Sequence, residues 1–264
     1  MPARSLAMVL ALITASVQVT FDGRAVRVAA GEQRALGAES APVPRTARVA
    51  PEAVHGLKVD FYDFPQWIPK GIDSLEDAKN YVAANKPTLS CTVNSRSISF
   101  PPDSGGSANC DRTTLGEYLF GKAGFETRLQ AAAQGKGEAL PARLKEPVNQ
   151  RSVFIYSGFV KVEKAGKYGI IIPVDDGDEL AIGGVVVHSK TTFGGMTGLD
   201  APEYAARVTI EEPGIYPVRV LHWDREQELG IHLFSDMDPR GEALGKGVLL
   251  PILQSDSGKP AGGK

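Results

Sequence analysis

The sequence predicts an all-β fold, an antiparallel β-sandwich or barrel that carries two short helices in an insertion. From about residue 151 the chain alternates apolar and polar residues with period two, and turn residues separate these short segments. Glycine, with 29 residues, and proline, with 18, are abundant, as short strands joined by turns require. The two clear helix-start signals both lie between residues 70 and 150.

Composition argues against several classes of protein. Of the 264 residues, 42% are hydrophobic and 23% are charged, which is typical of a globular chain and not of a disordered one. The 29 basic and 31 acidic side chains give a net charge of −2, which argues against a nucleic-acid-binding protein. The length allows one large domain or two small ones.

The start of the chain has the layout of a secretory signal peptide. Arg4 precedes an apolar run at residues 5–17, and small residues follow near its end. A membrane span needs about 20 apolar residues, so this run predicts no stable membrane span. Export would place the protein at the cell surface, in the periplasm or outside the cell. The alternative is a buried first strand or helix of a cytosolic protein.

The segment before the main domain is predicted to hold a hairpin and a linker. Residues 17–21 and 24–28 alternate around Asp22-Gly23, a pattern that predicts a small β-hairpin. Residues 29–55 are rich in Ala, Pro, Arg and Glu without a period, so we interpret them as a linker. The expected organisation is a signal peptide, a hairpin with a linker, a compact β domain and a flexible tail, at residues 1–16, 17–55, 56–252 and 253–264.

The insertion at about residues 70–150 holds the two predicted helices. Ser74 is placed to cap the first helix, whose first turn is acidic. Thr114 and Glu117 have the spacing of a capping box for a second short helix, which ends at Gly121.

Strands fill the rest of the domain. Gly183-Gly184 predicts a two-residue hairpin with a primed turn. The other expected strands lie between turn residues, at residues 56–64, 152–162, 167–174, 206–214, 215–223 and 229–236, and residues 247–253 close the domain.

Cys91 and Cys110 enclose a polar stretch rich in Gly and Ser. In an oxidising compartment a disulfide between them is the expected state, and it would stabilise the fold by about 3 kcal/mol. The alternative is two unrelated buried thiols. A metal site is not expected, because no CxxC motif or nearby histidine accompanies them.

The sequence carries no catalytic motif, so we expect a protein that is not an enzyme. A GxSxG elbow, an HExxH motif and a P-loop are all missing. His222 and His232 lie in adjacent predicted strands, where ordinary sheet positions are favoured over a zinc pair.

The best chemical signal is an acidic turn. Asp175, Asp176 and Asp178 surround Gly177 directly after a strongly apolar strand. Crowded carboxylates repel one another, and a hard cation such as calcium relieves the repulsion through oxygen ligands. Adjacent side chains on an extended trans backbone point to opposite sides, so chelation of one ion by both neighbours needs an unusual peptide. The alternative is a solvated acidic turn.

Four segments together resemble the protective-antigen domain family, the PA-fourteen domain. They contain a "GxY" strand, the "DDG" turn, an "I-G-G" hairpin and a closing "WD", at residues 56–64, 152–162, 165–188 and 213–235. The texture is most similar to versions in large calcium-dependent bacterial adhesins, as is the inserted stretch at residues 72–100. The resemblance covers roughly residues 56–252.

The resemblance implies a β-sandwich or barrel, and many family members bind carbohydrate through calcium. In those members two adjacent aspartates, joined by a cis peptide, chelate the ion, and a loop after the "WD" supplies further oxygens. Carried over to this chain, the metal ligands are Asp175, Asp176, Glu226 and Gln227. The residues expected to contact the sugar ligand are Asp175, Asp176, Asp224, Arg225 and Glu228.

The loop at residues 224–228 departs from the adhesin pattern, in which glycines often follow the Asp. Either Glu226 or Glu228 adds a carboxylate that closes the open metal position, or Arg225 fills or narrows the site. The loop at residues 190–203 is either a rim of the site or a plain mobile loop.

The leading interpretation is an exported, non-enzymatic module that recognises glycans through calcium in surface adhesion. The alternative is a structural or assembly module of a surface appendage or secretion complex, in which residues 17–55 dock onto a partner protein. A glycan-processing enzyme would need two acids about 5–10 Å apart across a cleft, and nothing in the sequence locates such a pair.

Overall fold

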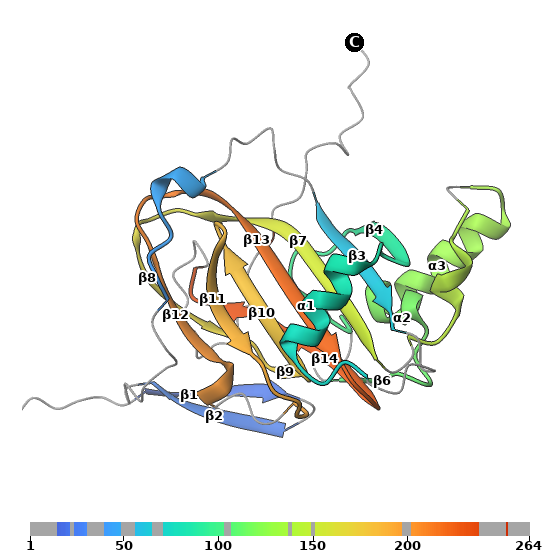
Figure 1. The fold of residues 1–264 in the computed structure, drawn as a ribbon, viewed down its shortest axis with the longest axis horizontal. Helices are drawn as coiled ribbons and strands as arrows, with labels where there is room; N and C mark the ends of the chain where they lie inside the picture. The colour runs from blue at the N-terminus through green and yellow to red at the C-terminus, as the bar shows by residue number, and fades with distance from the viewer. Residues whose placement is uncertain are drawn as a thin grey trace, which may run out of the picture.

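The computed structural model describes residues 15–21, 24–30, 40–48, 56–64, 71–102, 107–136, 139–148, 151–196, 202–237 and 252. Strands dominate this part of the chain, and they form antiparallel sheets stacked as a sandwich (Figure 1). The predicted fold class is therefore confirmed. The predicted signal peptide lies outside the described residues apart from its last two residues, and the predicted tail lies wholly outside them.

One layer is a six-stranded antiparallel sheet. Its order is β11 (Val185–Lys190), β10 (Gly177–Ile182), β13 (Gly214–Asp224), β7 (Ser152–Val162), β3 (Leu57–Asp63) and β4 (Leu89–Val93). The predicted Gly183-Gly184 hairpin joins β10 to β11, and both glycines have positive φ angles.

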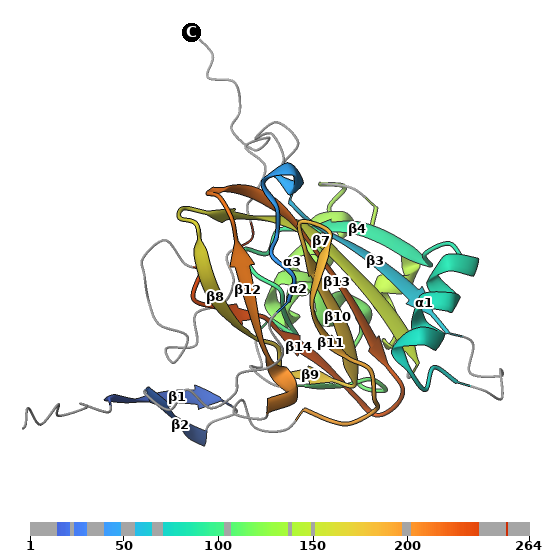
Figure 2. The same cartoon turned by 60° about the vertical axis from the view of Figure 1, so that its left-hand side comes forward.

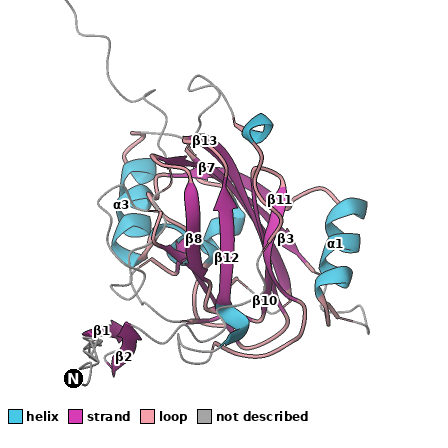
Figure 3. Cartoon of the chain, turned by 90° about the vertical axis from the view of Figure 1, so that its left-hand side faces the viewer, coloured by secondary structure: helices cyan, strands magenta, loops and turns pink. Residues whose placement is uncertain are grey.

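The opposite layer contains β8 and β12, which face the six-stranded sheet across the core (Figures 2 and 3). Its strands are β12 (Ala205–Ile210), β8 (Gly166–Ile171) and β15 (Phe234–Ser235). The strand β14 (Glu228–His232) pairs with three short strands, β5 (Ser99–Phe100), β6 (Ala108–Asn109) and β9 (Val174–Asp175).

Strand periodicity explains why the six-stranded sheet is buried on both faces. On β13, Val220 faces the main core between the layers, whereas Leu221 and Trp223 belong to a second apolar cluster on the outer face. The helix α1 (Leu75–Ala84) covers that outer face with Leu75 and Ala78. By the same alternation His222 and Asp224 share the inner face with Val220, which places polar groups at the end of the core.

The two predicted helices form with the predicted caps. The Ser74 side chain accepts a hydrogen bond from Asp77 N, and Thr114 and Glu117 form the capping box of α2 (Leu115–Phe120). A third helix, α3 (Lys122–Ala133), was not predicted, because Gly121 was interpreted as the end of helical structure. Gly121 has a φ of 69° and separates two consecutive helices. None of the helices in the described part of the chain is long and apolar enough to cross a membrane.

The segment before β3 contains the predicted hairpin, in which β1 (Ala15–Phe21) pairs antiparallel with β2 (Arg24–Ala30). Part of the predicted linker is packed onto the domain. Val43 is fully buried, forms a parallel bridge to Ile210, and its N–H donates to Thr209 O at 2.8 Å. The packed domain therefore includes residues before position 56. The sequence did not predict this, because an isolated apolar side chain carries no periodic signal.

Cys91 and Cys110 are free thiols, so the predicted disulfide is wrong. Cys91 lies in the middle of β4 and is half-buried against the core, whereas Cys110 follows β6, which pairs with β14. The Cys110 Sγ faces Asp224 Oδ2 at 3.6 Å. The pairing of β6 with β14 turns Cys110 toward the acidic end of β13, and Cys91 stays on the edge strand of the sheet.

Candidate functional site

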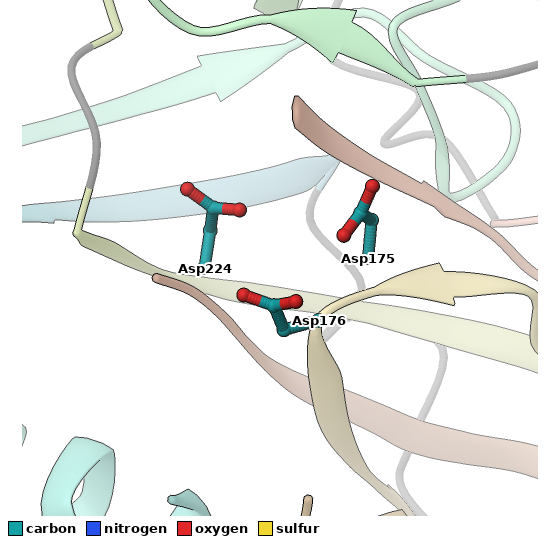
Figure 4. Close-up of side chains that lie close together, drawn as sticks. All are labelled: Asp175, Asp176 and Asp224. Atoms are coloured by element: carbon teal, nitrogen blue, oxygen red, sulfur yellow. The ribbon is translucent and has the colours of Figure 1, made fainter. Parts of the chain in front are cut away.

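Three buried aspartates converge at one end of the sandwich (Figure 4). Asp175 ends β9, Asp176 follows it, and Asp224 ends β13. One carboxylate oxygen from each lies within 4.8 Å of the others. Their exposed fractions are 6%, 1% and 0%, so this is not a solvated acidic turn. We call these residues the aspartate cluster.

The Asp175–Asp176 peptide bond is cis, as the family resemblance implies. The next residue, Gly177, begins β10 directly opposite Trp223 on β13. A Cβ atom at position 177 would come within 2.5 Å of Lys190 O and Trp223 Nε1. Glycine at this position therefore allows β10 to approach β13, and this approach places Asp176 beside the end of β13.

The hydrogen bonds of the aspartate cluster leave part of its oxygen atoms without a protein partner. Asp176 accepts from Arg225 N at 2.8 Å and from Gly194 N at 3.2 Å. Asp224 Oδ2 accepts from the Cys110 thiol, whereas Asp224 Oδ1 is buried and has no hydrogen-bond partner. A buried carboxylate oxygen without a donor is costly, so Asp224 Oδ1 points to a missing cation or proton.

Burial and mutual repulsion disfavour ionisation of these carboxyls. Burial, and then the Asp176 carboxylate, raises the pKa of Asp175 to about 7. Burial also raises the pKa of Asp176, and burial with the two neighbouring charges raises the pKa of Asp224 well above its usual range. An added cation would reverse these shifts, and a set of oxygen donors suits a hard cation such as calcium.

Lys190 lies close to the aspartate cluster, and its charge favours ionisation of Asp175 and Asp176 without cancelling the effect of burial. Its ammonium group donates to Val174 O at 3.3 Å and to Gly194 O, and burial lowers its pKa. The contribution of Lys190 is therefore one buried positive charge held by carbonyl groups next to three carboxyls.

A cavity of about 240 Å³ opens above the aspartate cluster. Its lining combines acidic side chains with one exposed aromatic ring, and it consists of Asp175, Asp176, Phe193, Gly195, Glu226, Gln227 and Glu228. The predicted loop at residues 224–228 therefore does flank the two adjacent aspartates. Asp224 differs from the expectation, because it joins the buried cluster, whereas Glu226 and Gln227 lie on the cavity wall.

Arg225 is not among the residues that line the cavity, so it does not fill the site, which was one alternative from the sequence. Its guanidinium lies 4.7 Å from the centre of the Phe193 ring, and its Nε lies 3.4 Å from Asp73 Oδ1. Gln227 takes a left-handed backbone conformation that favours glycine, with a φ of 70°. The Gln227 carbonyl accepts from Cys110 N at 2.8 Å, which ties the loop to the insertion.

Asp178 leaves the acidic turn and pairs with a histidine. Its Oδ2 lies 2.9 Å from His188 Nδ1, and His188 Nε2 donates to Glu203 O at 2.7 Å. Burial alone would lower the pKa of His188, but the Asp178 carboxylate and the Glu203 carbonyl outweigh burial and raise it.

His222 and His232 occupy buried sheet positions, and they form no zinc pair. The His222 Nε2–H donates to Asp175 O at 2.7 Å, and His232 Nδ1 lies 2.8 Å from Ser99 Oγ. Burial lowers the pKa of His222 to about 4, so the ring is neutral and positions the backbone of Asp175.

Sequence reasoning missed the roles of Lys190 and Cys110, whereas Phe193 and Gly195 lie in the loop at residues 190–203, for which a rim of the site was one alternative. Lys190 carried no usable signal, because burial along residues 185–190 does not alternate: Val187 and His188 are both buried, next to a register shift between β10 and β11. Cys110 carried none either, since only the tertiary structure brings it to the end of β13.

No protein-family model matches the chain, and no curated protein matches it. Among solved structures, the PA14 domain of the antifreeze protein MpAFP is similar, with a TM-score of 0.54 and 18% identity, over 78% of this chain and 93% of that one. A PA14 sugar-binding domain from an RTX adhesin has a TM-score of 0.48 and 21% identity, over 72% and 93% of the two chains. Epithelial adhesin 9 A domain from Candida glabrata, in complex with Galb1-4GlcNAc, has a TM-score of 0.43 and 14% identity, over 83% and 96%.

The likeness to the antifreeze-protein domain shows that this chain has the PA14 fold. This is the fold of the protective-antigen-type domain that the sequence resembles.

Proposed function

We propose that this chain is a non-enzymatic, calcium-dependent carbohydrate-binding module of an exported bacterial adhesion protein. The observation that carries the proposal is Asp224 Oδ1, a buried oxygen without a partner that lies among two other buried carboxyls below an open cavity. The resemblance to protective-antigen-type domains supports carbohydrate as the ligand, because many of these domains bind carbohydrate through calcium. The apolar run at residues 5–17 supports export.

Asp175, Asp176 and Asp224 are the side chains that would hold calcium. A bound ion would supply open coordination positions for two neighbouring hydroxyl groups of a sugar ring. The backbone N–H groups of Arg225 and Gly194 orient Asp176, and His222 orients the Asp175 backbone. These contacts preorganise the cluster before any ligand arrives.

The cavity wall favours a neutral sugar. Glu226 and Glu228 place two further carboxylates on the rim, so an acidic or sulfated sugar would meet repulsion there. The Phe193 ring is 46% exposed and borders the same cavity, so the part of the ring that Arg225 leaves uncovered offers an apolar surface to the C–H face of a pyranose ring.

A structural module is the second candidate, and one observation favours it. Two residues of the 224–228 loop are bound to the insertion, Glu228 through Ser107 Oγ and Gln227 through Cys110 N. A cation at the aspartate cluster would then fasten the insertion to the sandwich without receiving a sugar.

Calorimetric titration of the full chain with calcium tests the metal site. We expect one site in the wild type and its loss in Asp176→Asn. Asp73→Asn is the matched control, because Asp73 is an exposed carboxylate that pairs with Arg225 outside the cluster. Equal calcium binding by all three proteins would overturn the assignment.

A glycan array with and without chelator then separates the two candidates. Calcium-dependent binding of neutral glycans supports the lectin. Calcium binding without any bound glycan supports the structural module.

A further inference from the structure

The strand β4 ends the six-stranded sheet, and its outer edge borders a groove. One edge of β4 pairs with β3 from Leu57↔Val93 to Phe61↔Leu89. Within the described residues no strand pairs with the other edge. An edge strand presents backbone N–H and C=O groups outward, ready to pair with another strand.

Two adjoining cavities follow this free edge. The first has a volume of about 640 Å³ and is lined on the strand side by Ser90, Cys91 and Thr92. Successive side chains of a strand point to opposite faces, so three consecutive residues line one cavity only where it runs along the edge. The second cavity, of about 190 Å³, continues along Val93 and Asn94.

The far wall of both cavities belongs to the helical insertion. Phe120 and Arg128 line both cavities, so the two form one groove along β4. Apolar residues dominate the remainder of the wall of the larger cavity, and these are Ala131, Ala139, Leu140, Pro141 and Leu144. We call this feature the β4 groove.

The charges on the described lining of the β4 groove are positive. Arg128 lies over the Phe120 ring at 4.1 Å, and Lys136 is the second cation of the wall. No carboxylate occurs among the described residues that line either cavity. Asp60, on the neighbouring strand β3, accepts a hydrogen bond from Ser90 Oγ at 2.5 Å.

We propose that the β4 groove binds an extended acidic peptide segment of a partner protein, which adds to the sheet as a strand next to β4. Backbone hydrogen bonds to the free edge would give affinity, and alternate side chains would give specificity. Apolar side chains of the peptide contact Ala139 and Leu140, and its carboxylates pair with Arg128 and Lys136. This surface is distinct from the aspartate cluster, because β7 and β3 separate β4 from β13.

Cys91 provides a reporter inside the groove. It lines the larger cavity and is half-buried, and burial raises its pKa to about 11. Cys110 is fully buried, and burial raises its pKa further above the usual range. Slow alkylation of the native protein at pH 8.5 therefore labels Cys91 in preference to Cys110.

The experiment uses the full chain and a blocked seven-residue peptide of alternating glutamate and valine, with a lysine–valine peptide for comparison. We expect the acidic peptide to bind by fluorescence anisotropy and to slow alkylation of Cys91. The double change Arg128→Glu and Lys136→Glu should weaken binding by about tenfold or more. Lys122→Glu is the matched control, because Lys122 lies on the same helix and lines a different cavity.

Three results would overturn the proposal. The first is equal binding of the two peptides, and the second is binding that leaves the alkylation rate of Cys91 unchanged. The third is protection of Cys91 by dodecanoate and not by the acidic peptide, which would make the groove a site for a small amphiphile. Thermal unfolding of each variant by circular dichroism ensures that a loss of binding is not a loss of the fold.

Discussion

Asp176 and Asp178, which flank Gly177, are both buried carboxyls, but they differ in the counter-charge that lies beside them. Asp178 is paired with His188, whose second nitrogen is bound to the Glu203 carbonyl. Asp176 lies among two further carboxyls, with one buried ammonium group nearby that binds carbonyls. The protein therefore pairs Asp178 with a histidine of its own, whereas Lys190 is the one nearby cation for three carboxyls, and an external cation would balance the rest of their charge.

Both regions retain one buried carboxylate oxygen without a hydrogen bond, Asp178 Oδ1 and Asp224 Oδ1. The difference therefore lies in the counter-charge and not in the count of hydrogen bonds. A buried acid with its counter-ion in place contributes to the fold at any calcium concentration. A buried acid without a counter-ion makes the stability of the fold depend on the concentration of a cation that binds it.

Removal of the histidine should have the largest effect. His188→Ala leaves Asp178 as a buried charge without its partner, and such a change destabilises a fold by about 3–5 kcal/mol. Urea unfolding with and without calcium measures it. We expect the loss under both conditions, and a loss that appears only in chelator would show that the two regions are one site.

Calcium should have the next largest effect. If calcium binds only the folded protein, a concentration of about 100 times its Kd stabilises it by about 2.7 kcal/mol. Asp176→Asn should abolish this gain, and His188→Ala should keep it. A wild-type melting temperature that changes neither with calcium nor with chelator would contradict the proposed metal site.

Gly177 tests whether the two regions depend on the same close approach of strands. Gly177→Ala places a Cβ against Lys190 O and Trp223 Nε1, and overpacking of this kind costs about 1–3 kcal/mol. We expect weaker calcium binding as well, because β10 and Asp176 must move. Gly124→Ala is the control: a Cβ there lies 3.7 Å from its nearest neighbour, so stability should not fall.

Local features of the fold were predictable from the sequence. The Ser74 and Thr114 caps, the Gly183-Gly184 turn and the period-two strands each depend on neighbours in the chain. The adjacent aspartates were also identified, because crowded acids after an apolar strand conflict with burial unless a cation is present.

Long-range partners were not predictable. Periodicity places Asp178 and Asp224 on the inner face of their strands, but it does not say that one meets His188 and the other meets Cys110. The wrong disulfide has the same origin, because spacing in the chain does not fix which strand β6 joins. Val43 carried no signal at all, since its burial depends on β12, which lies far along the chain.

The pH dependence of the Asp178–His188 pair gives a smaller effect. The folded pKa of His188 is raised above the unfolded value of about 6.5, so its contribution is complete below that pH. The contribution is lost as pH rises through the folded pKa. In saturating calcium we expect the free energy of unfolding to fall over this range, and His188→Gln should remove that slope. If the free energy of unfolding fell equally with pH in both proteins, the pH dependence would come from a group other than His188.

The smallest effect should come from Arg225, whose guanidinium lies on the Phe193 ring at the cavity of the proposed sugar site. Only the backbone N–H of Arg225 contacts the aspartate cluster, while its side chain lies on Phe193 and Asp73. Arg225→Ala should therefore change the calcium Kd by less than about twofold and stability by less than about 1 kcal/mol, because its ion pairs are exposed to solvent. If the proposed sugar site is correct, the same change should alter glycan affinity by freeing the Phe193 ring. A large loss of calcium affinity, measured by calorimetry, would mean that the guanidinium takes part in holding the cluster, and the counter-charge would then be partly internal there too.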